Sequence, residues 1–425
     1  MKLDIYIEIR EKEYHAGTIE TNDIGEAVFS YDEIYMKKPE AVPISVNLPF
    51  INEPYSAGRT RTFFEGLLPE GFTRRTVAHF IHAEESDYLK ILYALGKECI
   101  GAIRVAESDD EEIREDYKKI SMREMKQLAN EGAEKSAEIV SKSHLSLTGA
   151  SGKVGLYFDN QRGKWYLPTG TAPSTHIVKQ SHVRLNAIVV NEQLSMLTAK
   201  KLGIEVPETF VINTGDYQDA DILLASNRYD RTMAGSARAI SGLTRPMRLH
   251  QEDFAQALGI PSADKYEPGD AQYMKKAFDL IQAVSVSPIE DRMKLWEMIV
   301  FDFLIGNTDA HLKNFSLLYN EDGRGIRLAP AYDLVSTTVY TQSTKDMAFR
   351  IGGVHSINQM KRDTFLEAAE MVGMGKHIAM QSFDKLADGF EKSLLDAGKQ
   401  LKEQGFSGIK KMCSNILKTG GCHNL

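Results

Sequence analysis

A polar segment directly follows the longest apolar stretch of this chain, and it reads Gly306-Asn307-Thr308-Asp309-Ala310-His311-Leu312-Lys313-Asn314-Phe315-Ser316. The apolar stretch runs from Met298 to Ile305 and is interrupted by Asp302. It lies within a helical pattern over residues 292–305, which predicts a helix that ends where the polar segment begins. We therefore expect the helix to give rigid support to a loop that presents Asp309 and Asn314.

The spacing of these two side chains indicates the chemistry of the loop. Four residues separate Asp309 from Asn314, as in the D-x-x-x-x-N pattern of protein-kinase catalytic loops. In such loops the Asp accepts the proton of an incoming hydroxyl group, and the Asn coordinates Mg²⁺ on the phosphates of the nucleotide. The pattern therefore predicts phosphoryl transfer from ATP, with Asp309 as the proton acceptor.

Other charged residues lie at positions that fit such a site. Asp333 follows a strand-like segment, residues 325–328, where a second metal-binding carboxylate is expected after the catalytic loop. Lys179 ends a segment with β-branched residues, and a Lys in such a strand can direct its ammonium group toward phosphates. Glu192, at the start of the next predicted helix, is a candidate ion-pair partner for Lys179.

A glycine-rich segment precedes them: Ser146-Leu147-Thr148-Gly149-Ala150-Ser151-Gly152-Lys153-Val154-Gly155. Its glycines allow the backbone N–H groups to approach phosphate oxygens closely. The segment is not a Walker A box, because Val154 follows Lys153 where that motif requires Ser or Thr. Taken alone it could equally be a hairpin without a ligand. In chain order, however, the segments match a phosphate loop, a lysine, a helix glutamate, a catalytic Asp–Asn pair and a metal-binding Asp.

The composition is that of an ordinary globular protein, with 42% apolar and 26% charged residues in a chain of 425. This length predicts two or three compact units. The net charge of −8 argues against a protein that coats nucleic acid. Three scattered cysteines favour a reducing compartment, and neither a signal peptide nor a bilayer-spanning stretch is evident. We therefore expect a cytoplasmic protein with no membrane association.

The order of the predicted elements indicates an α+β fold. Strand patterns dominate the first 35 residues, and residues 61–95 look helical. After residue 140, strands are predicted over 145–158, 164–168, 176–179, 208–212 and 222–226, and helices dominate beyond residue 250. Such an arrangement suits an enzyme with two lobes, a β-rich N-terminal one and an all-α C-terminal one. The predicted segments are residues 1–105, a nucleotide-binding part over 140–245, and a helical catalytic part over 246–425.

Over nearly its whole length the chain resembles the HipA family of toxin kinases. The most specific matching block is Asp309 to Ser316. The other matching stretches are Phe63–Gly71, Leu145–Gly155, Thr175–Lys179, Arg228–Arg231, Gln251–Phe254, Lys265–Glu267 and Tyr332–Leu334. Ordinary kinases lack the pair formed by Gln251-Glu252-Asp253 and Lys265-Tyr266-Glu267.

The resemblance implies a two-lobed, protein-kinase-like fold and an ATP-dependent Ser/Thr protein kinase that uses Mg²⁺. Asp309 would be the catalytic base, and Asn314 and Asp333 would hold the metal. The implied nucleotide contacts are Thr148, Gly149, Ala150, Ser151, Gly152, Lys153, Lys179, Asn227, Arg228, Tyr229, His311, Tyr332 and Asp333. Ser146 matches the serine at which the family is autophosphorylated and switched off. A phosphoserine beside a phosphate-binding loop would repel ATP.

The resemblance also implies partners. The substrate class of the family is the aminoacyl-tRNA synthetases, with glutamyl-tRNA synthetase in the best-known case, and their phosphorylation arrests translation and growth. The usual partner is HipB, a small helix-turn-helix antitoxin, through which the toxin reaches operator DNA. We expect residues 340–346 and the C-terminal lobe to determine substrate preference.

Two other interpretations remain open from the sequence. Asp309, His311 and Asp333 could ligate a transition metal, which would give a metal-dependent phosphohydrolase. Alternatively, the chain could be a catalytically silent co-repressor within an antitoxin–DNA complex. The presence of Asp309, Asn314, Asp333 and Lys179 argues against that second alternative.

Overall fold

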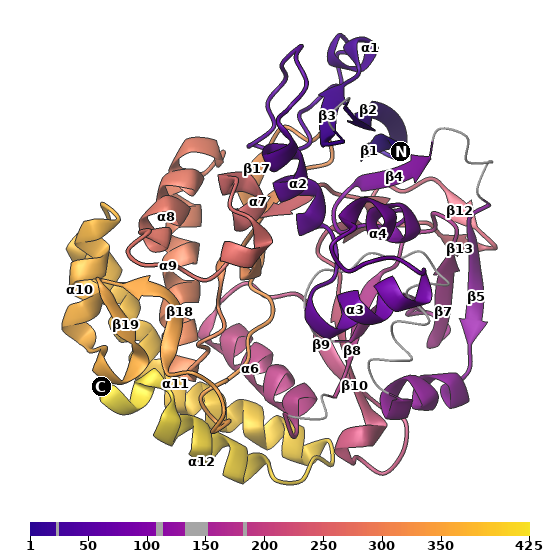
Figure 1. The fold of residues 1–425 in the computed structure, drawn as a ribbon. Coiled ribbons are helices and arrows are strands. Elements are labelled where there is room, and N and C mark those ends of the chain that lie inside the picture. Colours follow the sequence, from indigo (N-terminus) through magenta and orange to yellow (C-terminus); the bar gives the residue numbers. More distant parts are fainter. Residues whose placement is uncertain (23–24, 108–113, 132–151, 182–184) are drawn as a thin grey trace. The chain divides into compact units, whose positions relative to one another are not determined.

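The computed structural model describes the chain except for residues 23–24, 108–113, 132–151 and 182–184 (Figure 1). The chain divides into two compact units. The first unit consists of Met1–His182, Ile212–Ser262 and Leu317–Ile326, and the second of Val183–Val211, Ala263–Ser316 and Arg327–Leu425. These units are defined by packing, whereas the three segments predicted from the sequence are continuous stretches, whose boundaries stay predictions.

The first unit begins with a four-stranded antiparallel sheet in the order β3-β2-β1-β4. Its strands are β1 (Lys2–Ile9), β2 (Lys12–Thr21), β3 (Ala27–Tyr31) and β4 (Ile103–Glu107). Along β1 every second residue, from Leu3 to Ile9, is apolar and buried. This alternation places one face of the sheet against the core of the unit.

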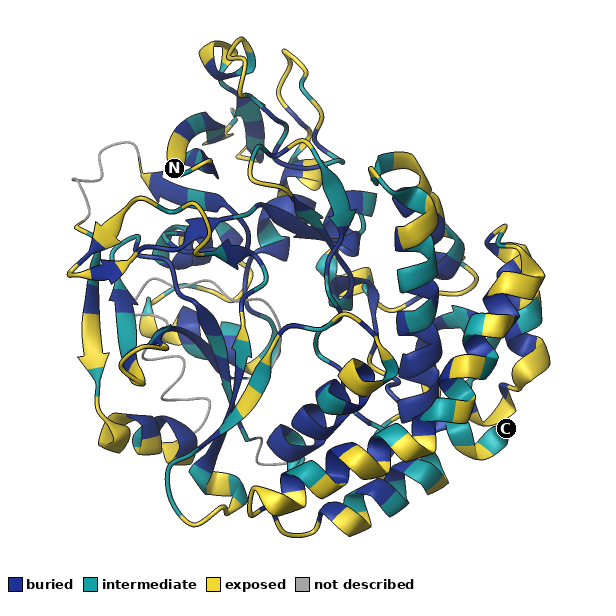
Figure 2. Cartoon of the chain, turned by 180° about the vertical axis from the view of Figure 1, so that it is seen from behind, coloured by how far each residue is buried: buried dark blue, intermediate teal, exposed yellow. Residues whose placement is uncertain are grey.

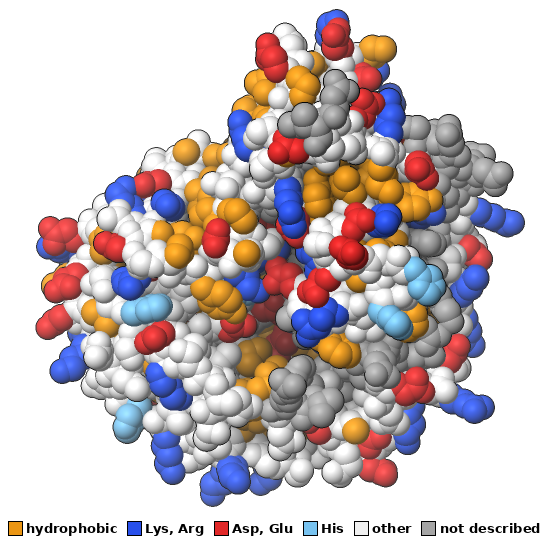
Figure 3. Space-filling view, viewed as in Figure 1, with side chains coloured by type: hydrophobic (Ala, Val, Ile, Leu, Met, Phe, Trp, Pro, Cys, Tyr) orange, Lys and Arg blue, Asp and Glu red, His pale blue; other side chains and the backbone are white. Residues whose placement is uncertain are grey.

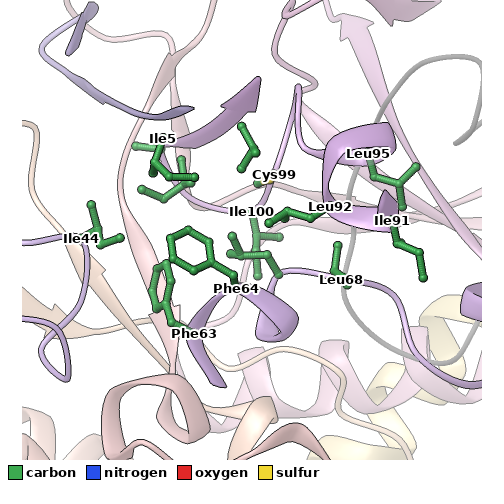
Figure 4. Close-up of a cluster of buried hydrophobic side chains, with 14 of the residues drawn as sticks. Ile5, Ile44, Phe63, Phe64, Leu68, Ile91, Leu92, Leu95, Cys99 and Ile100 are labelled. Atoms are coloured by element: carbon green, nitrogen blue, oxygen red, sulfur yellow. The ribbon is translucent and has the colours of Figure 1, made fainter. Parts of the chain in front are cut away.

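Helices cover the core that this sheet helps to form. They are α1 (Glu33–Met36), α2 (Ala57–Gly66), α3 (Gly71–Phe80) and α4 (Tyr88–Leu95). The helical segment predicted over 61–95 is therefore confirmed as parts of three separate helices. Figure 4 shows Phe63 and Phe64 of α2 and Leu92 of α4 close to Ile5 of β1, and all of them are buried in one apolar cluster. Each fully buried side chain of this size stabilises the unit by about 1.5–3 kcal/mol.

A six-stranded sheet in the order β5-β7-β6-β8-β10-β9 carries the predicted phosphate-binding segments. Its strands are β5 (Asp116–Ile120), β6 (Lys153–Asp159), β7 (Lys164–Thr169), β8 (His176–Gln180), β9 (Thr209–Asn213) and β10 (Ile222–Asn227). The strands predicted over 164–168, 176–179, 208–212 and 222–226 are confirmed. Of the strand predicted over 145–158, only the part from Lys153 is described, and the rest lies outside the described residues.

Shorter elements complete the first unit. Two of them are short ladders, in which β11 (Arg231–Thr232) pairs with β14 (Met247–Arg248) and β12 (Ala239–Ile240) pairs with β13 (Leu243–Thr244). The others are the helix α7 (Phe254–Leu258) and the 3₁₀ turns η1 (Asp219–Asp221) and η2 (Ser262–Asp264), of which η2 borders the second unit. A further sheet has the order β15-β16-β17, with β15 (Gln251–Asp253), β16 (Ser316–Tyr319) and β17 (Ile326–Leu328).

The Gln251-Glu252-Asp253 part of the family fingerprint has structural roles in this sheet. Asp253 caps α7 in a capping box with Gln256. Glu252 is fully buried and accepts hydrogen bonds from the Ser45 hydroxyl, the Val46 N–H and the Tyr319 hydroxyl. Burial raises the pKa of Glu252 to about 7.

A buried ion network joins distant segments of the first unit. The Arg228 guanidinium contacts both Glu98 and Asp230, with N–O distances of 3.1 and 2.6 Å, and Arg231 contacts the same two carboxylates. All four side chains are at least 96% buried, since their exposed fractions are 0–4%. The two arginines balance the two acids, so the network carries no net charge. Arginine holds the pKa of Asp230 well below its usual range.

The second unit is mainly helical, with α6 (Ile188–Leu202), α8 (Tyr273–Val284), α9 (Pro288–Ile305), α10 (Arg362–Met371), α11 (Lys376–Glu403) and α12 (Ile409–Thr419). Short 3₁₀ turns lie at η3 (Leu312–Asn314), η4 (Ile357–Gln359) and η5 (Gly421–Asn424). Figure 2 shows a buried and an exposed side on the outer helices α11 and α12, as expected for amphipathic helices on a core. Among the described residues, no helix has both the length and the apolar character needed to cross a bilayer.

The C-terminal part is not entirely α-helical as predicted, because it contains an antiparallel hairpin. Its strands are β18 (Asp346–Ile351) and β19 (Val354–Ser356), which pair through Ile351 and Val354. Gly352 and Gly353 connect them with φ angles of 54° and 80°. Two consecutive positive φ angles define a type I′ turn, which glycine pairs favour.

Helix α9 is the core helix of the second unit, and it begins with Pro288 at its first turn. The predicted helix over 292–305 is confirmed and extends one turn further toward its N-terminus. Every residue from Met298 to Ile305 is buried, including Asp302. The Asp302 carboxylate oxygen accepts a hydrogen bond of 2.8 Å from the Asn307 side-chain amide. Burial raises the pKa of Asp302 to about 7.

We expect Glu98→Gln to destabilise the protein by about 3–5 kcal/mol, because Arg228 and Arg231 would stay buried without a balancing charge. The midpoint of urea unfolding measures this loss. Arg362→Ala is the control, since Arg362 forms a bidentate pair with Asp384 on the surface and should contribute little. Equal midpoints for the two variants would contradict a stabilising role for the buried network.

The second prediction concerns the pH dependence of stability. The pKa of Asp302 is raised from 3.8 to about 7 by folding, so between these pH values only the unfolded chain ionises at this position. Ionisation of the unfolded chain therefore lowers the free energy of unfolding as the pH rises from 4 to 7. An amide does not titrate, so Asp302→Asn should gain stability relative to wild type over this range, on the order of 3 kcal/mol. Parallel stability–pH curves for the two proteins would show that Asp302 is ionised in the folded state.

Candidate functional site

The candidate catalytic loop begins where α9 ends at Gly306. This residue has a φ of 75°, and its N–H donates to the Phe303 carbonyl in the last turn of the helix. A Cβ atom here would lie 2.1 Å from the Thr338 hydroxyl oxygen. Both the left-handed backbone and this close approach require glycine. The chain thus turns sharply out of a buried helix into the polar segment.

Hydrogen bonds to uncharged groups fix the first residues of the loop. The Thr337 hydroxyl accepts from the Thr308 N–H at 2.8 Å and donates to the Gly306 carbonyl. Asn307 connects the helix to the loop, because its amide group donates to Asp302 and its side-chain oxygen accepts from the Asp309 N–H at 3.2 Å. The backbone of Asp309 is therefore tied to the core helix through a single side chain.

Asp309 is exposed, although the residues on either side of it are buried. Its carbonyl group accepts hydrogen bonds from the Asn314 side-chain amide at 3.0 Å and from the His311 N–H at 2.8 Å. One carboxylate oxygen accepts a hydrogen bond of 2.5 Å from the Tyr266 hydroxyl. The structure thus brings Asp309 and Asn314 together in one turn and presents the Asp309 carboxylate at the surface.

Asp333 lies on a segment that is attached to the same turn. The hydroxyl of the preceding residue, Tyr332, donates to the Lys313 carbonyl at 2.8 Å and contacts the Ser316 hydroxyl at 2.6 Å. These contacts lie on either side of Asn314 in the chain. Asp333 itself has a φ of 54°, which is uncommon for a residue other than glycine. Seven other described residues besides glycine also have positive φ angles, so this angle alone does not identify a functional site.

The predicted phosphate-binding lysines are neighbours in the six-stranded sheet of the first unit. Strands β6 and β8 pair so that Lys153 lies directly opposite Lys179. Residues opposite each other in an antiparallel pair project from the same face of the sheet, with Cβ atoms about 4.5–5.5 Å apart. Two lysine side chains on one face of a sheet can both contact a polyphosphate that lies across them. Their chemistry therefore fits the phosphates of a nucleotide.

The remaining predicted nucleotide contacts are placed as follows. Ser146 and Thr148 to Ser151 lie outside the described residues. Asn227 is exposed at the end of β10, and the His311 ring is buried with Tyr266 against it. The Arg228 side chain is fully buried and paired with Glu98 and Asp230, so it is not available to a nucleotide. A contact at Arg228 within the predicted hinge 227–229 would therefore involve its backbone, and this contact stays a prediction.

The structure also assigns positions to residues whose role the sequence did not reveal. Asp302 and Thr337 support the loop, and Tyr266 hydrogen-bonds to Asp309. A signal for Asp302 was present, since it is the one acid within the apolar stretch that precedes the loop. Tyr266 belongs to the family fingerprint, but nothing in the sequence connects it to Asp309.

The side chains expected to hold Mg²⁺ are an amide and a carboxylate, those of Asn314 and Asp333. Among the residues that the structure describes, no three His, Cys, Asp or Glu side chains are grouped closely enough to hold a metal ion. Asp309, His311 and Asp333 are all described, so the transition-metal site of the phosphohydrolase alternative is not formed. An Asn and an Asp are sufficient protein ligands for Mg²⁺, which takes its other oxygens from phosphates and water.

Comparisons with known proteins agree over most of the chain. The model of the HipA N-terminal domain matches residues 7–106, and that of the HipA-like C-terminal domain matches residues 145–394. A protein of Sinorhizobium fredii named "Putative kinase Y4mE" is 32% identical over 371 residues, which cover 86% of this chain and 85% of the relative. The "Serine/threonine-protein kinase toxin HipA" of Shewanella oneidensis is 24% identical over 356 residues, which cover 81% of this chain and 78% of that toxin.

A solved structure confirms the predicted fold class. The complex of Shewanella oneidensis HipA, HipB and operator DNA contains a chain that matches 99% of this one, with 96% of its own length covered. The TM-score is 0.80 at 21% sequence identity, which shows a common α+β, HipA-type fold. Together with the two domain matches, this likeness leads to one conclusion: the chain belongs to the HipA family.

Proposed function

We propose that this chain is an ATP-dependent Ser/Thr protein kinase that acts as the toxin of a HipA/HipB-type system. The observation that carries the proposal is the exposed carboxylate of Asp309, held at the end of a buried helix with Asn314 in the same turn. A kinase needs such a carboxylate to accept the proton of a substrate hydroxyl, with a metal-binding amide next to it. The curated relatives named as kinases support the same activity.

Each proposed site residue has one task. ATP with Mg²⁺ would supply the transferable phosphoryl group when bound. Asn314 and Asp333 would hold the metal, and Lys153 and Lys179 would bind and orient the phosphates. Asp309 would hold the attacking Ser or Thr hydroxyl by a hydrogen bond and take its proton. The lysines belong to the first unit and the other three residues to the second, so their convergence on one nucleotide is part of the proposal.

We extend the proposal to self-inactivation at Ser146. This serine is the first residue of the glycine-rich segment, three positions before Gly149. A phosphate group on it would add a charge of about −1.5 to −2 and would repel the phosphates of ATP. The kinase would then lose its nucleotide after one turnover on itself.

The proposed partners follow from the family. A HipB-like antitoxin is supported by the relative solved with HipB and operator DNA. Contact with the DNA would be made mainly through the antitoxin, because the net charge is −8 and acidic and basic side chains are mixed on the face shown in Figure 3. We propose an aminoacyl-tRNA synthetase as the substrate protein, with translation and growth arrested by its phosphorylation.

The central test is Asp309→Asn. We expect phosphoryl transfer to fall by about 10²–10⁴-fold, as for loss of a general base, while ATP still binds. Transfer from γ-labelled ATP to the protein itself measures the rate, and mass spectrometry should locate the phosphate on Ser146. Phosphate release without any phosphoprotein would instead support a hydrolase, and wild-type protein without turnover would support a silent co-repressor.

The phosphate-binding role of Lys179 is tested by nucleotide affinity. Lys179→Met removes one charge-assisted contact, so we expect ATP to bind about 10–100-fold more weakly in calorimetry. Lys164→Met is the matched control, because Lys164 is an exposed lysine on strand β7 of the same sheet. Equal affinity of the two variants would remove Lys179 from the site.

A further inference from the structure

The segment Lys265-Tyr266-Glu267 lies against the candidate catalytic loop through three contacts. The Lys265 carbonyl accepts a hydrogen bond of 3.3 Å from the Leu312 N–H. The Tyr266 ring packs edge-on against His311, with ring centroids 5.1 Å apart. The Tyr266 hydroxyl donates to the Asp309 carboxylate at 2.5 Å. All these residues belong to the second unit.

Glu267 fixes the backbone of this segment. Its side chain is 1% exposed and accepts hydrogen bonds from the N–H groups of Tyr273 and Arg350, at 3.0 and 2.6 Å. Its own N–H donates to the Ala348 carbonyl in strand β18. With Lys265 bonded on the other side, Tyr266 projects from a backbone that is held at both ends.

Packing alone does not explain where the Tyr266 ring points. The residue is 45% exposed, so it buries much less apolar area than the tyrosines of the core. Its hydroxyl, in contrast, reaches the one side chain of the loop that the proposed reaction uses as a base. A phenol hydroxyl is protonated at neutral pH and can donate to a carboxylate.

We propose that Tyr266 is a positioning residue for Asp309, which rests on the proposed function of Asp309 as the base. Asn314 and His311 hold the Asp309 carbonyl, and Tyr266 holds the carboxylate group itself. A hydrogen bond at one oxygen restricts rotation of the group, which holds it in place for the incoming hydroxyl group. The Lys265 ammonium group also lies near this contact, 5.5 Å from the Tyr266 ring centroid.

The kinetic test compares Tyr266→Phe with Tyr273→Phe. The control removes a hydroxyl that donates to the Asp264 carbonyl at 2.7 Å and has no contact with Asp309. In Tyr266→Phe we expect kcat to fall about tenfold, as for loss of one hydrogen bond to a charged group, with KM for ATP unchanged. An unchanged KM for ATP, together with an unchanged midpoint of urea unfolding, separates this loss from partial misfolding. A faster rate would overturn the proposal, because Tyr266 would then be a barrier to substrate.

A second measurement does not depend on activity. The carboxyl carbon signals of the Asp side chains can be recorded by NMR at one fixed pH, and the signal missing from Asp309→Asn identifies residue 309. We expect this signal to shift in Tyr266→Phe but not in Tyr273→Phe, because the hydrogen bond changes the electron density at the carboxyl carbon. An identical chemical shift in wild type and both variants would refute the positioning role. If the NMR shift is present but wild type transfers no phosphate, the contact stands and the proposed kinase function falls.

Discussion

The first unit depends on a set of buried charges that are stable only together. Removal of an ion from water costs several kcal/mol, so a buried arginine is tolerated where a carboxylate faces it. Here Arg228 and Arg231 are completed by Asp230, close in sequence, and by Glu98, 130 residues earlier in the chain from Arg228. The segments that carry these residues must therefore come together for either to be stable.

The buried charge network is also connected to the strands that are predicted to bind the nucleotide. The Arg228 N–H donates to the Thr175 carbonyl, directly before β8, and β8 pairs with β6 to set Lys179 opposite Lys153. In a similar buried group, Glu8 forms ion pairs with Arg245 and Arg248. These pairs connect strand β1 to residues 245–248. The N-terminal sheet thus contributes to the position of the lysines, although none of its residues was predicted to bind the nucleotide.

The second unit supports its loop in a different way. The groups that hold residues 306–309 are hydroxyls, an amide and Asp302, a carboxyl whose pKa burial raises to about 7. Below about pH 7 the Asp302 carboxyl is mostly protonated and adds little repulsion to the Asp309 carboxylate, and the hydroxyls and the amide do not reduce its basicity as a nearby cation would. These contacts therefore hold the loop in place and have little effect on the basicity of the proposed base, Asp309.

The sequence predicted the features that depend on neighbouring residues. The alternation in β1, the long apolar run of α9 and the Asp–Asn spacing are local patterns, and the elements formed where they were expected. The hairpin β18–β19 was missed although Gly352-Gly353 is a turn signal, because helical patterns surround it. The burial of the Arg228 side chain, within the segment 227–229 predicted to contact ATP, was not foreseen, because it depends on Glu98, a partner that no local pattern shows.

The places of the residues predicted to bind phosphate and metal depend on strand register and on contacts within each unit. Lys153 and Lys179 lie opposite each other because strands β6 and β8 pair in this register, and a shift of one residue would place their side chains on opposite faces of the sheet. Asp333 is held by its neighbour Tyr332, whose hydroxyl contacts Lys313 and Ser316 on either side of Asn314 in the chain. The register of one strand pair and the contacts of one hydroxyl group therefore fix the residues on which the proposed binding of phosphate and metal depends.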